Sequence, residues 1–335
     1  MLLPVAILSY FGNTRNMLAS NSGKIAILFG GSGFLGKHLA ELLSKNGFRI
    51  LIADLLKPNT LIGEFVECDV RQEINFSIDG KPDLVVNLAA VHRTPGHEDS
   101  EYYETNIGGA SNIINWCNEV QAEYLVFISS IAVYGPSSEL KSEKSIPTPV
   151  SAYGMSKLLA ESICRSWQQE DPKMRNLIIC RPAVIFGDGE NGNFARMAKA
   201  ISKGLFLIPG DRNIIKSCGY VKDLASSILF TFNNVRGCFL YNFSFATETT
   251  IGEISDAMAK IGDWRKPISI SLQQVTRVLL RLPNPASAFG ARISKLLLST
   301  RIDPIELKSI GFEWKYGLDS SLQDWFFTSN FDIEK

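Results

Sequence analysis

The segment 25–36 (IAILFGGSGFLG) constrains the fold more than any other part of the chain. Its five apolar residues, 25–29, predict a strand that is buried on both faces, as in a parallel sheet. Gly30, Gly33 and Gly36 follow, and a helical apolar pattern begins at Leu35. A strand, a glycine turn and a helix in this order can hold a dinucleotide pyrophosphate, because the helix N-terminus offers free N–H groups. The alternative is a plain turn.

A second strand is predicted over 48–54, and it ends in Asp54, 18 residues beyond Gly36. A carboxylate at this position accepts hydrogen bonds from the adenosine ribose hydroxyls of NAD. It repels the 2′-phosphate of NADP, so we predict NAD as the cofactor. The alternative is a strand end that is merely solvated.

Strand and helix patterns alternate along the first half of the chain, which predicts an α/β fold with a Rossmann-type doubly wound parallel sheet. Beyond residue 182 the periodicity weakens, and we expect a smaller C-terminal α+β lobe that binds substrate. The further predicted strands are 65–70, 84–90, 124–128 and 176–180, the helices are 99–120 and 152–169, and 137–150 is a loop. The predicted domains are an extension (1–22), an NAD-binding domain (23–182, with 220–242 returning to it) and a substrate lobe (183–219 and 243–335).

Composition excludes several classes of protein. The 34 basic and 34 acidic residues balance, so no overall charge points to nucleic acid as a partner. Six scattered cysteines without a CxxC pair, and only three histidines, predict reduced thiols and no metal site. The apolar stretch 2–10 is too short to span a bilayer and lacks the features of a secretory signal. We therefore expect a cytoplasmic protein.

Two tightly spaced residues carry the predicted chemistry. Tyr153 and Lys157 lie four residues apart, on one face of a predicted helix. A nearby ammonium lowers the pKa of a phenol, which can then exchange a proton with a sugar hydroxyl while a nicotinamide takes up hydride. Ser130, 23 residues before Tyr153, follows a buried strand at the sheet edge where ligands bind, so its hydroxyl can share the substrate proton. A surface Tyr–Lys pair and a strand-end cap are the alternatives.

Together these motifs resemble the extended short-chain dehydrogenase/reductase family, and within it the NAD-dependent sugar epimerases and dehydratases. The resemblance covers about residues 24–245. It implies that Tyr153 is the acid/base, that Lys157 tunes it and contacts ribose, and that Ser130 polarises the substrate hydroxyl. It also selects the glycine register that begins at Gly30 over the overlapping one that begins at Gly31. The implied cofactor contacts, besides Tyr153 and Lys157, are Gly30, Gly33, Phe34, Leu35, Gly36, Asp54, Asp69, Val70, Leu88, Ala89, Ala90 and Asn106.

Departures from the family pattern narrow the predicted reaction. The family's 4,6-dehydratases carry an Asp-Glu pair directly after the catalytic hydroxyl residue, where this chain has Ile131 and Ala132. Neither side chain can move a proton, so dehydration is disfavoured. Val184 stands where many members have an asparagine that binds the nucleoside diphosphate sugar, and valine cannot make that hydrogen bond. Lys216 stands where arginine usually contacts the diphosphate; lysine keeps the charge but loses the bidentate contact.

Four further segments, 90–93, 192–197, 209–213 and 216–223, are similar to those of a subgroup of bacterial polysaccharide-pathway enzymes. This subgroup includes N-acetylhexosamine 4-epimerases, some of which act on undecaprenyl-diphosphate-linked sugar, and related 4-ketosugar reductases. We therefore predict NAD-dependent 4-epimerisation of a nucleotide- or polyprenyl-linked sugar, with a reductase or dehydrogenase as the alternative. A non-catalytic NAD-sensing protein is the alternative from another class. The substrate contacts that we expect are His92, Arg93, Ser130, Asn193, Arg196, Arg212 and Lys216.

Two surfaces are candidates for association. Between Asp263 and Asp303 the chain has seven basic residues and no acidic one, interleaved with apolar clusters. Two basic amphipathic helices within 272–300 would suit peripheral contact with the inner face of the cell membrane, and the alternative is ordinary packing within the lobe. The resemblance also implies a homodimer, paired through 99–120 and 152–169.

Overall fold

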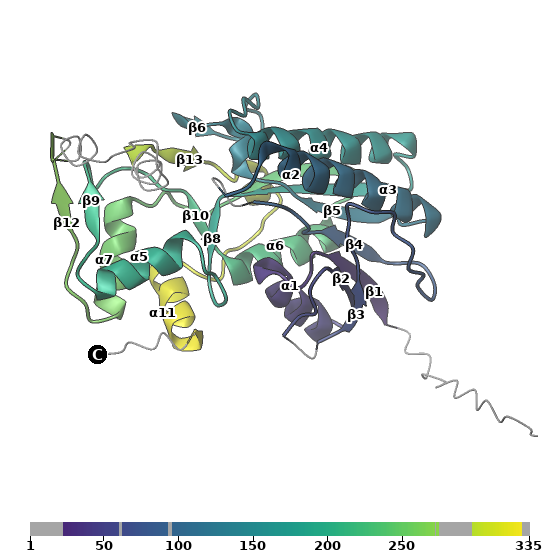
Figure 1. The fold of residues 1–335 in the computed structure, drawn as a ribbon, viewed down its shortest axis with the longest axis horizontal. Coiled ribbons are helices and arrows are strands. Elements are labelled where there is room, and N and C mark those ends of the chain that lie inside the picture. Colours follow the sequence, from purple (N-terminus) through teal and green to yellow (C-terminus); the bar gives the residue numbers. More distant parts are fainter. Residues whose placement is uncertain (1–22, 60–61, 93–95, 272, 275–296, 330–335) are drawn as a thin grey trace, which may run out of the picture.

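The computed structural model describes residues 23–59, 62–92, 96–271, 273–274 and 297–329. A parallel sheet of seven strands forms the core of one part of the molecule, on the right in Figure 1. The strands lie in the order β11-β7-β5-β4-β1-β2-β3. Because the chain proceeds outward from β1 in both directions, the carboxyl ends of β1 and β4 border the crevice where sheets of this kind bind ligands. The strands are β1 (Lys24–Phe29), β2 (Phe48–Asp54), β3 (Glu64–Glu67), β4 (Leu84–Asn87), β5 (Tyr124–Ile128), β7 (Asn176–Pro182) and β11 (Cys238–Phe243).

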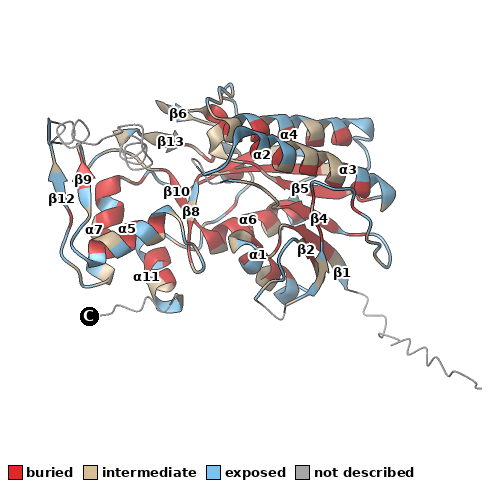
Figure 2. Ribbon diagram, in the orientation of Figure 1, coloured by how far each residue is buried: buried red, intermediate tan, exposed pale blue. Residues whose placement is uncertain are grey.

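Helices cover both faces of this sheet, as the sequence predicts for a doubly wound fold (Figure 1). Side chains alternate along each strand, so Leu28 packs into the core under one face and Ile27 into the core under the other. Figure 2 shows the strands as the most continuously buried part of the molecule. One face carries α1 (Phe34–Lys45) and α6 (Val221–Asn234), and the other carries α2 (Asp99–Tyr103), α3 (Gly109–Glu119) and α4 (Ala152–Glu170).

The helix predicted over 99–120 contains an irregular turn. Residues Glu104–Gly108 form a π-helical turn between α2 and α3, and this turn carries Asn106. Single π turns inside helices are often found at functional sites.

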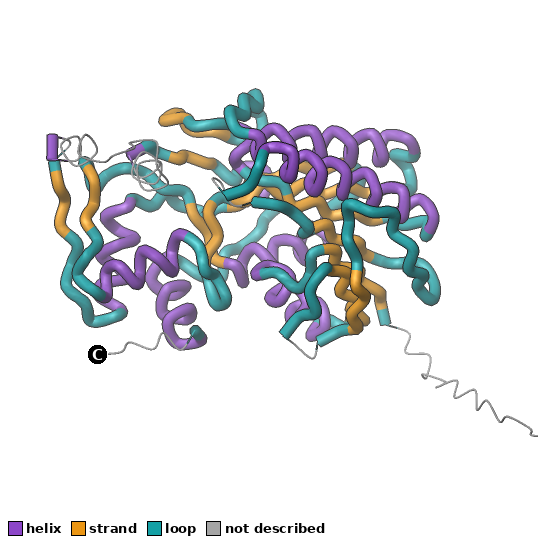
Figure 3. The backbone as a smooth tube through the Cα atoms, viewed as in Figure 1, coloured by secondary structure: helices purple, strands orange, loops and turns teal. Residues whose placement is uncertain are grey.

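A second group of elements packs around its own apolar core, which includes Phe186 and Phe194, stacked with ring centroids 4.4 Å apart. Figure 3 shows that helices and short strands are mixed in this part of the molecule. Its helices are α5 (Asn193–Ser202), α7 (Ile251–Ile261) and α11 (Leu318–Thr328), while α10 (Ile305–Ser309) lies against β11. Its short parallel pairs are β8 (Val184–Phe186) with β10 (Cys218–Tyr220), and β9 (Leu207–Pro209) with β12 (Ile268–Ile270).

The loop prediction for 137–150 is wrong at its start. Residues Ser137–Lys141 form strand β6, which pairs in parallel with β13 (Thr300–Ile302). The partner strand lies about 160 residues further along the chain, so no local pattern could reveal the pairing. The fold class itself is confirmed, with every ladder of the seven-stranded sheet parallel.

Three sequence predictions fall wholly or mostly outside the described residues: the extension 1–22, Arg93, and most of the basic segment 272–300. Within the described residues, no helix is long and apolar enough to cross a membrane. The same part of the chain holds no cluster of histidine, cysteine and acidic side chains suited to a metal ion.

Candidate active site

The fold requires glycine at both ends of the motif that follows β1. Gly30 has φ +74°, and a Cβ at this position would lie 2.5 Å from the backbone nitrogen of Ala89. A Cβ on Gly36 would lie 2.2 Å from the carbonyl oxygen of Gly31. Both distances are far below van der Waals contact. Glycine at position 30 therefore lets the turn pass close to the backbone after β4, and glycine at position 36 lets α1 pack close to the turn at Gly31.

Gly33 has no such packing reason to be glycine. It is exposed at the N-cap of α1, and a Cβ there would meet only the Gly30 carbonyl oxygen, at 3.4 Å. In the described part of the chain no side chain caps this N-terminus, and its first turn has no acidic residue. The free N–H groups and the open approach over Gly33 are what a dinucleotide pyrophosphate needs. The glycine turn therefore fits NAD on its own geometry, and Phe34 and Leu35 are the next residues of this helix.

Asp54, at the end of β2, holds the glycine turn in place. Its Oδ2 accepts a hydrogen bond from the Ser32 backbone N–H at 2.9 Å, and its Oδ1 accepts one from Leu56 N–H at 3.2 Å. The carboxylate thus lies beside the turn, where the ribose-binding acid of a dinucleotide site belongs. Its assignment as the ribose contact stays a prediction.

The next two predicted cofactor residues differ in their surroundings. The Asp69 carboxylate accepts hydrogen bonds from Arg71 Nε at 2.9 Å and Nη2 at 2.7 Å, and these bonds lower the pKa of Asp69. Val70 is buried against the start of α3. It lies so close to Gly109, the first residue of that helix, that a Cβ on Gly109 would be 2.8 Å from the Val70 Cγ2. The assignment of Asp69 and Val70 as cofactor contacts stays a prediction.

Asn106 connects the segment after β4 to the helix that bears the catalytic candidates. Its Oδ1 accepts from Val91 N–H at 3.0 Å, and its Nδ2 donates to the Val91 carbonyl at 3.1 Å and to Ser156 Oγ at 2.9 Å. These bonds hold the end of the segment formed by Leu88, Ala89 and Ala90. Asn106 is buried and its bonds hold this segment against α4, while its assignment as a cofactor contact stays a prediction. The sequence did not suggest Ser156, although it lies inside the Tyr-x-x-x-Lys motif.

Ser130 and Tyr153 meet as the sequence predicts. Ser130 caps a short 3-10 helix, Ile131–Tyr134, by accepting a hydrogen bond from Ala132 N–H at 3.1 Å. Its side chain is also hydrogen-bonded to Tyr153, which lies in the first turn of α4. Burial raises the pKa of Tyr153 and the Ser130 hydrogen bond opposes that shift. The ring of Tyr102, with its centroid 6.0 Å away, closes one side of Tyr153.

Lys157 is buried one turn beyond Tyr153, with 2% of its surface exposed. Its Nζ lies 4.5 Å from the ring centroid of Phe127, and burial lowers its pKa to about 8. The pKa of Tyr153 is raised by burial, lowered by Ser130 and raised by Tyr102. The lowering of the Tyr153 pKa by Lys157, which the spacing suggests, therefore remains a prediction.

Four of the predicted substrate contacts, Asn193, Arg196, Arg212 and Lys216, lie in the second group of elements. Arg196 donates to Asn193 Oδ1 at 2.9 Å, and both are exposed on α5. The Arg212 guanidinium is engaged by Asp256 at 2.6 Å and by the Pro267 carbonyl at 2.9 Å, so it supports the packing of that region. His92 is exposed at the end of the segment after β4.

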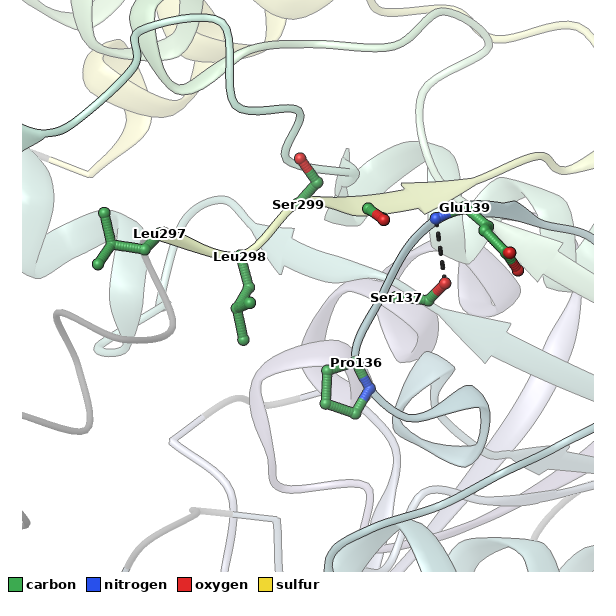
Figure 4. A pocket seen from close by; sticks show the side chains of 7 residues that line it. Pro136, Ser137, Glu139, Leu297, Leu298 and Ser299 are labelled. Atoms are coloured by element: carbon green, nitrogen blue, oxygen red, sulfur yellow. Dashed lines mark hydrogen bonds between the residues drawn. The ribbon is translucent and has the colours of Figure 1, made fainter. Parts of the chain in front are cut away.

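Lys216 lies beside a pocket that the sequence does not reveal. Its Nζ donates to the Leu298 carbonyl, and burial lowers its pKa to about 8. The pocket has a volume of about 550 Å³, and Figure 4 shows Pro136 facing Leu298 across it. Its lining residues are Pro136, Ser137, Ser138, Glu139, Leu297, Leu298 and Ser299.

The glycine-lined helix N-terminus, the acid at the end of β2 and the Ser–Tyr–Lys set define a dinucleotide-dependent enzyme that works on a hydroxyl group. The model of the NAD dependent epimerase/dehydratase family matches residues 26–239. The chain belongs to this family, and NAD is its cofactor.

Known relatives agree with this assignment. The chain is 30% identical over 315 residues to N-acetyl-alpha-D-glucosaminyl-diphospho-ditrans,octacis-undecaprenol 4-epimerase from Escherichia coli O157:H7, covering 89% of this chain and 94% of that protein. It is 26% identical over 359 residues to a UDP-glucose 4-epimerase from Cyamopsis tetragonoloba, covering 92% and 96%.

Solved structures share the fold. UDP-glucuronic acid 4-epimerase from Bacillus cereus, in complex with NAD, superposes with a TM-score of 0.71 at 18% identity, covering 90% of this chain and 97% of that one. UDP-glucose 4-epimerase from Thermus thermophilus, also with NAD, gives a TM-score of 0.70 at 20% identity and the same coverage. At these identities the likeness speaks for the fold alone.

Proposed function

We propose that this chain inverts C4 of an N-acetylhexosamine that is carried on a diphosphate, in the synthesis of a surface polysaccharide. The observation that carries the proposal is the hydrogen bond between Ser130 and Tyr153 at the carboxyl end of β5, one helical turn from Lys157. In this proposal the glycine turn would hold the pyrophosphate of NAD in the crevice beside it. The substrate lies against the second group of elements, 183–219 and 243–335, which we propose as the substrate lobe.

The proposed proton steps use residues of this chain. The Tyr153 phenolate takes the proton of the C4 hydroxyl, and the Ser130 hydroxyl hydrogen-bonds the same oxygen as it becomes a carbonyl. When bound, NAD would supply reversible hydride transfer at C4; inversion follows if the 4-keto sugar turns over before the hydride returns to its opposite face. Tyr153 then gives the proton back to the C4 oxygen. Ile131 and Ala132 can move no proton, so no water is eliminated on the way.

We propose undecaprenyl diphosphate as the first carrier to test and UDP as the second. The support for the lipid carrier is the relative from Escherichia coli O157:H7, whose name specifies an undecaprenol-linked sugar and which matches nearly the whole chain. Val184, 36% exposed on β8, supports the same choice, because valine offers no hydrogen bond to a nucleoside diphosphate sugar.

The decisive experiment incubates the purified protein with undecaprenyl-diphosphate-linked or UDP-linked N-acetylglucosamine and no added cofactor. We expect the C4-inverted N-acetylgalactosamine product by mass spectrometry and NMR, with no net absorbance change at about 340 nm. Stoichiometric consumption or appearance of NADH would instead identify the reductase or dehydrogenase. Tyr153→Phe should abolish turnover, whereas Tyr103→Phe, at an exposed tyrosine on α2, should retain it. Full activity of Tyr153→Phe would favour a non-catalytic role.

We propose that the chain forms a homodimer through the helices on the α3–α4 side of the sheet. The α2, α3 and α4 helices lie side by side there (Figure 1), and they expose the apolar side chains of Tyr103, Met155 and Leu159. A partner that covers them would remove this apolar surface from water. Light scattering coupled to size exclusion tests the proposal: Leu159→Glu should yield a monomer, and an unchanged mass would contradict it.

We propose peripheral contact with anionic membranes through 272–300. The support is the run of basic residues between Asp263 and Asp303, together with Leu298, 48% exposed. Co-sedimentation with vesicles that contain anionic lipid is the test, and it uses the full chain. Substitution of Arg277, Arg281, Arg292 and Lys295 by glutamine should abolish sedimentation, and unchanged sedimentation would show that the segment belongs to lobe packing.

A further inference from the structure

We propose that Glu161 and Arg181 are positioning residues, whose buried ion pair sets the place of Ser130 relative to Tyr153. The proposal rests on the roles of Ser130 and Tyr153 given above. Neither residue of the pair belongs to the reacting set that the motifs indicate. Both act through the segment that carries Ser130 and through the helix that carries Tyr153 and Lys157.

The ion pair is bidentate and almost completely removed from solvent. Arg181 Nε donates to Glu161 Oε1 at 2.8 Å, and Arg181 Nη2 donates to Glu161 Oε2 at 2.6 Å. Glu161 is 1% exposed and Arg181 is 3% exposed. Glu161 lies on α4, one turn beyond Lys157 and two turns beyond Tyr153, while Arg181 lies on β7. The pair therefore ties the catalytic helix to the sheet with two parallel, charge-assisted bonds.

The same pair is attached to both ends of the segment that bears Ser130. Ser129, directly before Ser130, donates its hydroxyl proton to Glu161 Oε1 at 2.5 Å. Arg181 Nη1 donates to the hydroxyl oxygen of Tyr134, the last residue of the 3-10 helix, at 2.9 Å. Ser130 lies between these two anchors. Since the anchors and α4 meet at one ion pair, a shift of the pair changes the separation of the Ser130 and Tyr153 hydroxyls.

A second strand completes this framework. The Tyr134 hydroxyl donates to Asn242 Oδ1 at 2.8 Å, and Asn242 N–H donates to Glu143 Oε1 at 2.7 Å. Asn242 belongs to β11, the strand next to β7. The end of the Ser130 segment is thus fixed against two neighbouring strands, and its position does not depend on a single bond.

Stability alone does not explain such an arrangement. A buried ion pair loses much of its Coulombic gain to desolvation, and an apolar pair of similar volume often stabilises a protein as well or better. An apolar pair could not accept the bond from Ser129 or donate the bond to Tyr134. What distinguishes the ion pair is therefore its directional hold on the Ser130 segment.

Three variants test the proposal. Ser129→Ala and Tyr134→Phe each remove one hydroxyl, and the double variant Glu161→Leu/Arg181→Met replaces the ion pair with an apolar pair. The first two each remove one anchor and leave the ion pair intact, so they should fold. Each is assayed on undecaprenyl-diphosphate-linked and UDP-linked N-acetylglucosamine. We expect kcat to fall about 10- to 100-fold, because small displacements of reacting groups have effects of this size. KM and the Kd for NAD should stay within about twofold of wild type.

The pH profile supplies a readout that a merely structural role would not move. Loss of either anchor weakens the Ser130 hydrogen bond to Tyr153, so the rising limb of kcat/KM should move to higher pH. Two controls are matched to the variants: Ser162→Ala, at a serine on α4 bonded to the Leu158 carbonyl, and Tyr124→Phe, at a buried tyrosine bonded to Val235. Tyr124→Phe should lower Tm without changing kcat.

Two results would overturn the proposal. In the first, Ser129→Ala and Tyr134→Phe lower Tm like Tyr124→Phe while kcat and the pH profile stay at wild-type values. In the second, the double variant folds and keeps wild-type kcat. If Tyr153→Phe also keeps wild-type kcat, the proposed function is what has failed. A wild-type kcat in the double variant together with an inactive Tyr153→Phe refutes the positioning role alone.

Discussion

Asn106 and Ser156 are joined by a hydrogen bond of 2.9 Å between two helices, although they lie 50 residues apart in the chain. Ser156 also donates to the Tyr153 carbonyl at 2.9 Å, so the bond reaches the first turn of α4. On its other side, Asn106 holds Val91 by both backbone groups. The buried amide of Asn106 therefore holds the segment after β4 against α4, the helix that carries Tyr153.

Replacing Asn106 should destabilise the protein more than replacing Ser156. Asn106→Ala leaves Val91 and Ser156 without this partner, and we expect a loss of about 2–4 kcal/mol in the free energy of unfolding, against about 1 kcal/mol for Ser156→Ala. Denaturant titration of both variants and the double variant measures their coupling, which should be about 0.5–1.5 kcal/mol. Additive losses would mean that the 2.9 Å bond contributes nothing.

Gly33 and Gly36 should respond differently to the same substitution. Gly36→Ala forces a Cβ to within 2.2 Å of a backbone oxygen and should lower Tm strongly. Gly33→Ala makes only an ordinary van der Waals contact, with the Gly30 carbonyl oxygen at 3.4 Å, and should lower stability by about 1 kcal/mol through the loss of a favoured N-cap residue. It should nevertheless weaken NAD binding about 10-fold or more, because the methyl group enters the approach to the helix N-terminus.

Calorimetric titration of NAD into the stripped protein, together with thermal melts, checks this pair of predictions. Retained NAD affinity in Gly33→Ala would show that the pyrophosphate does not approach over this residue.

Lys157→Met should stabilise the protein while it abolishes turnover. Burial lowers the pKa of Lys157 from 10.5 to about 8, so folding carries a cost for the charged ammonium at neutral pH. Removing the charge should recover up to about 3 kcal/mol and raise Tm by several degrees. Lys173→Met, at an exposed lysine in the turn after α4, serves as the control and should leave Tm unchanged.

The lowered pKa of Lys157 also predicts how the stability of the protein changes with pH. Between pH 8 and 10.5 the unfolded chain binds a proton at Lys157 that the folded chain does not, so stability rises with pH across this window. Below pH 8 both states are protonated and the contribution is constant. Lys216, whose pKa is also about 8, contributes in the same direction, so the difference between wild type and Lys157→Met isolates Lys157. An identical slope in both proteins would contradict the assignment.

Ser130→Ala should shift the pH profile of the reaction. Burial raises the pKa of Tyr153 and the Ser130 hydrogen bond lowers it, so loss of Ser130 leaves the phenol harder to ionise. The rising limb of kcat/KM should therefore move to higher pH, with a loss of about 100-fold or more at neutral pH. Ser130→Thr, which retains the hydroxyl, should restore the profile in part. A profile unchanged in Ser130→Ala would exclude a role for this hydrogen bond in setting the pKa.

Much of the reacting set could be predicted from sequence because the relevant physics is local. Gly30 is needed for a positive φ, and Tyr153 and Lys157 share a helix face through their spacing of four residues. The loop predicted over 137–150 was wrong because β6 exists only by pairing with β13, far along the chain. The π-helical turn at Asn106 likewise has no clear local signature.

The sequence by itself therefore determined the α/β class, the glycine turn, NAD as cofactor and the identity of the candidate acid/base. Periodicity, turn chemistry and i,i+4 spacing act over a few residues, so they are legible in the chain. Tertiary structure alone decided which distant side chains meet: Asn106 with Ser156, and Glu161 with Arg181. Those contacts depend on the order of strands in the sheet and on the packing of helices across it, which are set by the free energy of the whole fold. Gly33 illustrates the difference, because only the folded structure shows that packing does not require glycine at this position.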